Sequence, residues 1–236
     1  MSGSILIVSR NNLHLTKLAV RSALYQDVPV MVMLMDNYSS DGTLSWMKSK
    51  PLIIPIHTEK QLSLAACWNK GLKAFFQSGS DEVLILNNDI EIRPDTYKML
   101  RSMNQPFVTC VSVDTPDRLG VAGDRSPNEI LMGARPHPDF SCFMIRREVT
   151  NRVGWFDESY YPAYCEDNDY HVRMHRAGVK AICVDLPFLH HAAATVKSAE
   201  PGEVDRIKRG AIVNREKFRL QYGCIPGTKE YEELFV

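Results

Sequence analysis

The sequence predicts an α/β fold with a mostly parallel central sheet, helices on both of its faces and a C-terminal helical extension. Short apolar runs, typical of buried strands, alternate with segments of helical spacing through the first hundred residues. A length of 236 residues with 44% hydrophobic residues suits one packed core. Several apolar runs also end abruptly in polar residues, as strands do where a parallel sheet opens onto a ligand pocket.

The first half of the chain alternates strand and helix. Proline ends the first helix at Asp27-Val28-Pro29, and Pro55 places the third strand at an edge of the sheet. No GxGxxG follows the first strand, so the dinucleotide-binding version of this topology is not supported. The expected strands are residues 4–9, 30–35, 52–56 and 83–86, and the expected helices are residues 13–26, 43–48 and 63–76.

The second half begins with a long irregular segment. Residues 114–139 are rich in proline and glycine, and we expect a loop that faces the substrate. The elements expected after it are a strand at 140–146, helices at 147–153 and 166–176, a strand at 181–184 and a long helix at 203–222. We divide the chain into a domain of residues 1–196, with halves 1–100 and 101–196, and an extension of residues 197–236.

The composition narrows the class of protein. The 28 basic and 28 acidic residues balance, which gives no overall argument for binding nucleic acid or membranes. The six cysteines form no CxxC pair, and we expect free thiols in a reducing compartment. The sequence shows neither a signal-peptide pattern nor an apolar run of membrane-spanning length. We therefore expect a soluble, cytoplasmic protein.

Four polar groups have both a functional and a structural interpretation. Asp89 follows a buried strand, where it is either a pocket acid or an ordinary turn residue. Residues 166–169 (EDND) open a helix, whose free N–H groups favour acids in any case. His171 and His175 have a zinc spacing without an evident third ligand, so we expect a solvated helix face there. The basic residues of the C-terminal helix predict either a phosphate-contacting strip or, by default, a solvated surface.

Four segments, in this order and spacing, resemble the family 2-like inverting glycosyltransferases of the GT-A fold. They are DNYSSDGT (36–43), LSLAACWNKG (62–71), LILNNDIEIRPD (84–95) and VGWFDESYYPAYCEDNDYHVRMHRAG (153–178). The resemblance covers residues 4–195 and implies a Rossmann-like sheet. Asn87-Asn88-Asp89 resembles the NND variant of the DxD motif found in rhamnosyltransferase-like members. Trp68 departs from the pattern, because many members have arginine there.

This resemblance implies metal-dependent, inverting transfer of a sugar from a nucleotide-diphosphate sugar, a UDP-sugar being favoured, to an acceptor hydroxyl. Asp167 would be the general base, with Glu166 beside it. Asp89 would hold Mn²⁺ or Mg²⁺ together with His190 or, less favoured, His191. The residues expected to contact or support the donor are Ser9, Asn11, Asp36, Ser39, Asn69 and Asn88.

The alternative is a catalytically inactive nucleotide-sugar-binding module of the same fold, for which the NND triplet and Trp68 are the motivation. The acceptor is left open by the sequence. A glycan, a lipid-linked glycan or another hydroxyl-bearing molecule, including a modified DNA base, would fit the chemistry. The oligomeric state is also open.

Overall fold

The computed structural model describes residues 2–120, 132–133, 138–191 and 201–235. Much of the predicted 114–139 loop, residues 121–131 and 134–137, lies outside the described residues. Its described parts include a 3₁₀ turn at Pro116–Leu119 and the short strand β7 at Met132–Gly133.

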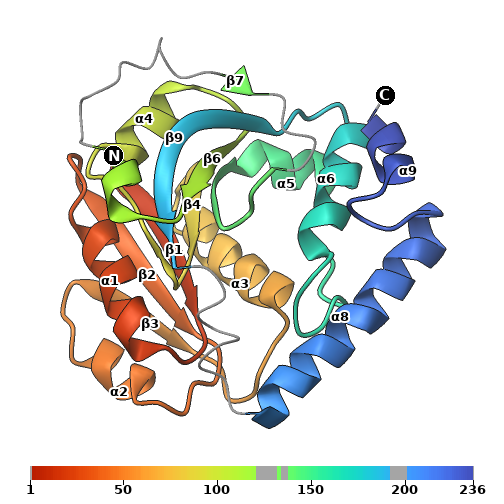
Figure 1. Ribbon diagram of the computed structural model, residues 1–236. Coiled ribbons are helices and arrows are strands. Elements are labelled where there is room, and N and C mark those ends of the chain that lie inside the picture. Colours follow the sequence, from red (N-terminus) through yellow and green to blue (C-terminus); the bar gives the residue numbers. More distant parts are fainter. Residues whose placement is uncertain (1, 121–131, 134–137, 192–200, 236) are drawn as a thin grey trace.

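A nine-stranded sheet forms the centre of the molecule (Figure 1), in the order β3-β2-β1-β4-β8-β6-β9-β5, with β7 paired to β9. The strands are β1 (Gly3–Ser9), β2 (Val30–Asp36), β3 (Ile53–His57), β4 (Glu82–Asn87), β5 (Ile90–Glu91), β6 (Phe107–Val113), β8 (Cys142–Arg146) and β9 (Ile182–His190). Strands β1 to β4 are parallel, and Pro55 lies on the edge strand β3, as predicted. Strand β8 is antiparallel to both β4 and β6, so the second half of the sheet is mixed.

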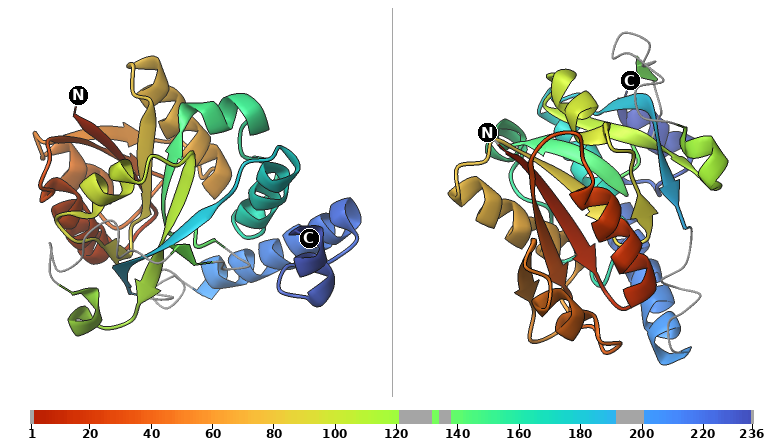
Figure 2. Two further views of the ribbon diagram at one scale, coloured as in Figure 1. Left: turned by 90° about the horizontal axis from the view of Figure 1, so that it is seen from above. Right: turned by 90° about the vertical axis from the view of Figure 1, so that its left-hand side faces the viewer.

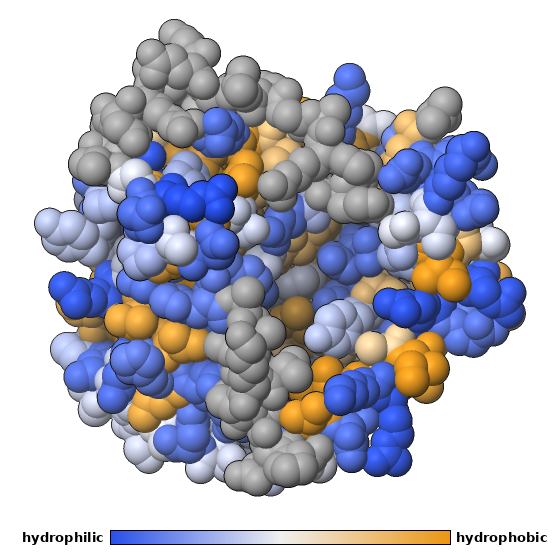
Figure 3. Space-filling view, viewed as in Figure 1, coloured by the Kyte–Doolittle hydropathy of each residue, from blue (hydrophilic) through white to orange (hydrophobic). Residues whose placement is uncertain are grey.

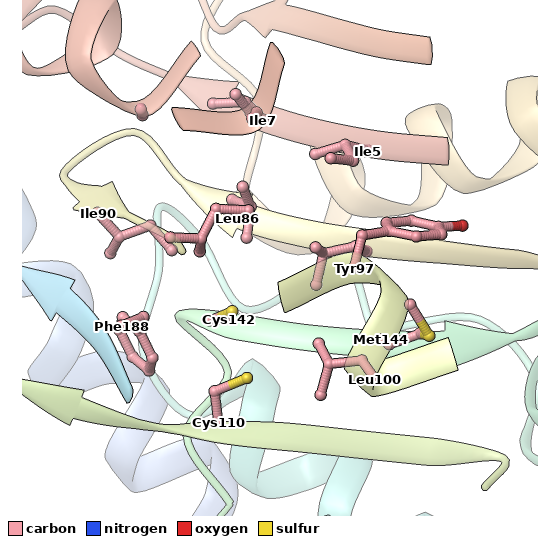
Figure 4. Close-up of a cluster of buried hydrophobic side chains, with 14 of the residues drawn as sticks. Ile5, Ile7, Leu86, Ile90, Tyr97, Leu100, Cys110, Cys142, Met144 and Phe188 are labelled. Atoms are coloured by element: carbon pink, nitrogen blue, oxygen red, sulfur yellow. The ribbon is translucent and has the colours of Figure 1, made fainter. Parts of the chain in front are cut away.

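Helices cover both faces of the sheet (Figure 2), which confirms the predicted α/β layers. One face carries α1 (Leu13–Leu24), α2 (Thr43–Lys48) and α4 (Thr96–Ser102); the other carries α3 (Leu64–Gln77), α5 (Arg147–Val153) and α6 (Glu166–Arg176). Because side chains alternate along a strand, Ile5 and Ile7 join the first core, and Leu6 and Val8 join the second. Figure 4 shows the first core, where Tyr97 of α4 lies beside residues of β1 and β4.

Several features differ from the predicted elements. Helix α4 and strand β6 were not predicted. The strand predicted at 181–184 continues through Pro187 to His190. A register shift between Thr109 and Val111 of β6 accommodates this stretch of β9, where proline supplies no N–H to the ladder. All six cysteines are buried and free, as expected.

The C-terminal extension consists of α8 (Pro201–Tyr222), α9 (Lys229–Glu232) and a 3₁₀ turn at Glu233–Phe235. It packs on α6, where Phe218 and Tyr231 are fully buried against a small third core, and α8 lies along the outside of the molecule (Figures 1 and 2). The predicted solvated face of α6 is partly covered by this end of the chain, since the His171 ring stacks on Phe235 at 4.2 Å. Within the described parts of the chain, no helix is both long and apolar enough to cross a bilayer.

Candidate functional site

A cavity of about 690 Å³ opens where the carboxyl ends of β1, β2 and β4 meet residues from α6, β9 and α8. It lies in the recess at the centre of the face shown in Figure 3. The strand-end polar residues therefore meet at one edge of the sheet, as the parallel half predicts. Its walls include Arg10, Asn37, Asn88, Asp89 and His190 on the sheet side, and Glu166, Asp167 and Arg215 on the helix side.

Asp89 and His190 face the cavity together. The antiparallel pairing of β5 with β9 sets Ile90 opposite His190 and so brings the neighbouring Asp89 within reach. The distance from Asp89 Oδ1 to His190 Nε2 is 3.5 Å. His191 does not line the cavity, because its Nε2 lies 2.9 Å from Glu91 Oε1. The structure thus distinguishes the two histidines that the sequence left as alternatives.

The pair fits a divalent cation. Two donor atoms bound to one octahedral Mg²⁺ stand about 3 Å apart, close to the observed separation. The hydrogen bond that His190 donates to Asp89 raises the pKa of His190, against the effect of burial, and a bound cation would take the place of that shared proton. Among the described residues, no cluster of three His, Cys, Asp or Glu side chains could hold an ion. A cation held by Asp89 and His190 would need further oxygen ligands from a bound molecule or from water.

Asn88 lines the cavity, but its amide group supports the loop after β1. Its Nδ2 donates to the Asn11 carbonyl at 3.0 Å, to Thr16 Oγ1 at 3.0 Å and to Ser9 Oγ at 3.3 Å. Ser9 is fully buried in this network. These contacts fix the position of the loop that carries Arg10.

Asp36, Ser39 and Asn11 form a second support beneath the cavity. The Asp36 carboxylate is fully buried and lies 2.8 Å from His57 Nδ1, and it also accepts from the Ser39 N–H at 3.3 Å. Ser39 Oγ in turn accepts from the Asn11 N–H at 2.7 Å. None of these three lines the cavity, although its wall includes their neighbours Arg10 and Asn37. In this structure they bind protein groups, and their predicted contacts with the donor stay predictions.

Asn69, also predicted on the donor side, lies away from the cavity. Its Oδ1 accepts from the Phe156 N–H at 3.0 Å, and its Nδ2 donates to the Phe156 carbonyl at 2.9 Å. The same Nδ2 donates to Glu158 Oε1 at 2.9 Å. With 1% of its surface exposed, Asn69 joins α3 to the segment before α6. In this structure it is a positioning residue.

The acids at the start of α6 form the opposite wall. Burial, followed by the charge of Asp167, raises the pKa of Glu166 well above its usual range. Glu166 is 4% exposed, and its Oε2 has no hydrogen-bond partner among the described residues. Burial also raises the pKa of Asp167, opposed by backbone N–H groups and reinforced by the charge of Asp139. Cavity acids with raised pKa values suit proton transfer.

Asp169, two residues later, has a structural role. It is fully buried and accepts from Arg173 Nε at 2.9 Å, in an ion pair between residues four positions apart on the same helix. Tyr222 donates its hydroxyl to Asp169 at 2.7 Å, and Gln221 donates at 3.2 Å. These bonds attach the C-terminal extension to the helix that carries Glu166 and Asp167.

Several charged cavity residues were not among the predicted site residues, although Arg215 belongs to the basic strip that the sequence offered as an alternative. Asp139 lines the cavity because β8 is antiparallel, so the start of this strand lies at the pocket edge rather than its end. A polar residue flanking a strand was the available signal, but the strand direction was needed to use it. Arg10 is paired with Glu203 of α8, 193 positions later. Arg215 reaches the cavity from the same helix.

Comparison with known proteins agrees with this geometry. The sequence model of the family described as "Glycosyl transferase family 2" matches residues 4–154, more than half of the chain. A "Galactofuranosyl glycosyltransferase" of Leishmania donovani is 34% identical over 99 residues, which are 36% of this chain and 23% of that protein.

Solved structures share the fold. GalNAc-T7, crystallised with UDP, GalNAc and Mn²⁺, has a TM-score of 0.61 at 16% identity, over 80% of this chain and 44% of its own. S. aureus TarS residues 1–349 have a TM-score of 0.57 at 15% identity, over 100% of this chain and 78% of their own. The chain thus spans less than half the length of the first two proteins compared.

Proposed function

Because the chain belongs to glycosyl transferase family 2, we propose that it transfers a sugar from a nucleotide-diphosphate sugar to an acceptor hydroxyl, with metal dependence and inversion at the anomeric carbon. One observation carries the proposal: the Asp89–His190 pair and the Glu166–Asp167 pair lie in the walls of one cavity. The first pair suits a cation bound to diphosphate, and the second suits removal of a proton. The reaction needs the cation on the side of the anomeric carbon where the diphosphate departs, and the base on the side where the acceptor hydroxyl attacks.

Asp89 and His190 would hold Mn²⁺ or Mg²⁺, which when bound neutralises the charge that gathers on the departing diphosphate. Asp167 would accept the proton of the acceptor hydroxyl while that oxygen attacks the anomeric carbon. The new bond forms on the face opposite the breaking carbon–phosphate oxygen bond, so the configuration inverts. Glu166 would stay protonated beside Asp167, because burial and the adjacent charge of Asp167 raise the pKa of Glu166 well above its usual range.

We favour a UDP-sugar as the donor, and UDP with Mn²⁺ in the GalNAc-T7 crystal supports this choice. The NND triplet resembles rhamnosyltransferase-like members, while the named relative is a galactofuranosyl enzyme, so the sugar is to be identified by assay. Arg10 and Asn37 are the residues of the first two loops that line the cavity. A glycan or a lipid-linked glycan is the acceptor class that we propose.

The test is Asp167→Asn, assayed after a thermal-shift panel of nucleotide sugars, with and without Mn²⁺, has identified the donor. We expect the variant to lose transfer and to keep the donor-induced shift. Asp157→Asn is the matched control, because Asp157 pairs with Lys217 outside the cavity. Full activity in Asp167→Asn would contradict the base assignment. Donor binding by the wild type, with neither transfer nor hydrolysis for any acceptor, would favour the inactive binding module.

A further inference from the structure

The outward face of α8 carries large apolar side chains. Ile212, Val213 and Leu220 are 70%, 65% and 73% exposed. At 3.6 residues per turn these three share one side of the helix, while the buried Asn214 and Phe218 lie on the opposite side. A helix that covers a core usually turns polar residues to water, so an apolar stripe on the solvent side indicates a contact surface. Orange residues mark this helix at the lower right of Figure 3.

Basic residues accompany the stripe. Helix α8 has six bases and three acids between Glu203 and Tyr222, although the whole chain is neutral. Two of the acids are paired with Arg206 and Arg219. Lys208 and Arg209 are exposed, and neither forms an ion pair with any residue that the structure describes. The third acid, Asp205, is exposed and precedes Lys208 and Arg209 by three and four residues, so it offsets part of their charge. The six bases still exceed the three acids, so the helix offers a net positive charge next to the apolar stripe.

We propose that this face of α8 docks on an anionic membrane surface. Aliphatic side chains enter the boundary between headgroups and acyl chains, and lysine and arginine meet lipid phosphates, so one surface needs both. A second copy of the chain is a poorer occupant, because two positive faces would repel each other. A nucleic acid is also poorer, because its phosphate backbone offers no apolar contact to Ile212, Val213 and Leu220.

The stripe continues towards the catalytic cavity. A groove of about 580 Å³ beside it is lined by Val213, Arg209, Tyr161 and Pro162, and Pro162 also lines the cavity. Tyr161 is 42% exposed there. Docking would thus bring the cavity mouth close to the lipid surface, which suits an acceptor carried on a lipid. The inference of a lipid-borne acceptor rests on the proposed function, whereas the inference that α8 docks on a membrane does not.

The experiment is flotation of the purified full chain with phosphatidylcholine vesicles, with and without phosphatidylglycerol. We expect binding that needs phosphatidylglycerol and weakens as salt shortens the range of charge interactions. Replacing Ile212, Val213 and Leu220 together by glutamine should lower the partition coefficient about tenfold or more. Lys208→Gln with Arg209→Gln should lower it by about fivefold for each charge. Sugar transfer to a soluble acceptor should be unchanged in both variants, since none of these residues lines the cavity.

The matched control is Leu52→Gln with Ile54→Gln, because these residues are 72% and 42% exposed at the edge of the sheet around β3, away from α8. It should bind vesicles as the wild type does. Absence of binding to phosphatidylglycerol vesicles, or equal loss in this control, would overturn the proposal. The proposal would also be overturned if the wild type bound no vesicles and had a larger mass in solution than the triple variant, which would indicate self-association through this face. Binding of the wild type to DNA but not to vesicles would overturn it as well. Vesicle binding is read without any sugar transfer, so its failure is distinct from failure of the proposed reaction.

Discussion

The Asp89 carboxylate and the His190 imidazole face each other across the β5–β9 pairing, with 3.5 Å between Oδ1 and Nε2. The next residue, His191, turns to Glu91 instead. The pairing of the two-residue strand β5 with β9 therefore places two adjacent histidines in different surroundings, with one in the cavity and one outside it.

This sorting predicts different metal responses. A nucleotide diphosphate with Mn²⁺ at a hundred times its dissociation constant should stabilise the wild type by about 2.7 kcal/mol, which raises the Tm of a domain of this size by roughly 5 to 10 °C. Asp89→Asn and His190→Ala should lose most of this metal-dependent rise, as measured by differential scanning fluorimetry. His191→Ala is the control and should keep it. Equal losses in the two histidine variants would count against the assignment.

The pH dependence of transfer should report on Asp167. A base works only when deprotonated, and burial raises the pKa of Asp167, with Asp139 adding to the effect. Activity should therefore fall as the pH drops through a value above that of an ordinary aspartate. Asp139→Asn removes a nearby negative charge, so the acid limb of the kcat profile should move to lower pH. Asp81→Asn, an exposed carboxylate far from the cavity wall, should leave the limb in place.

Asn69 allows a structural and a donor-binding role to be separated. Asn69→Ala leaves the buried Phe156 N–H and carbonyl without their partner, which should cost about 1–3 kcal/mol of unfolding free energy. Urea denaturation measures this cost. The dissociation constant for the donor, measured on the folded variant at low temperature, should change little because Asn69 does not line the cavity. Weak donor binding with normal stability would restore the role expected from the sequence.

Gly71 should not tolerate a methyl group, despite its place inside α3. A Cβ there would lie 2.4 Å from Leu6 Cδ2, and Leu6 is fully buried. Gly71→Ala gains about 1 kcal/mol of helix propensity, but overpacking costs about 1–3 kcal/mol, so we expect a net loss of stability. Combining it with Leu6→Val should recover part of the loss. A double-mutant cycle by chemical denaturation checks the coupling, and additive effects would contradict it.

The sequence was sufficient for the parallel half of the sheet and for the polar residues that its strand ends bring together. Four site residues predicted from the sequence lie in one cavity, namely Asp89, Glu166, Asp167 and His190. The direction of β8 was not accessible, because an apolar run such as FSCFMIR has the same pattern in either direction. Asp139 was missed for that reason, and the sheet is more mixed than expected.

Sequence also could not separate residues that line a cavity from those that hold its walls. Ser9, Asp36 and Asn69 are buried polar residues at or near the pocket, and either role calls for the same side chains. In this structure Ser9 contacts Thr16, Asp36 contacts His57 and Asn69 contacts the Phe156 backbone, and their predicted donor contacts stay predictions. The Arg10–Glu203 pair joins residues too distant in the chain for any local pattern to connect them.

The attachment of α8 to Asp169 has a consequence for synthesis. Asp169 receives bonds from Gln221 and Tyr222, residues 52 and 53 positions later. Chains begin to fold at the N-terminus while they are being made, so the sheet can assemble on the ribosome well before these donors emerge. The helix start that carries Glu166 and Asp167 is then completed last. A nascent chain would hold a formed sheet edge before the opposite wall of the cavity is complete.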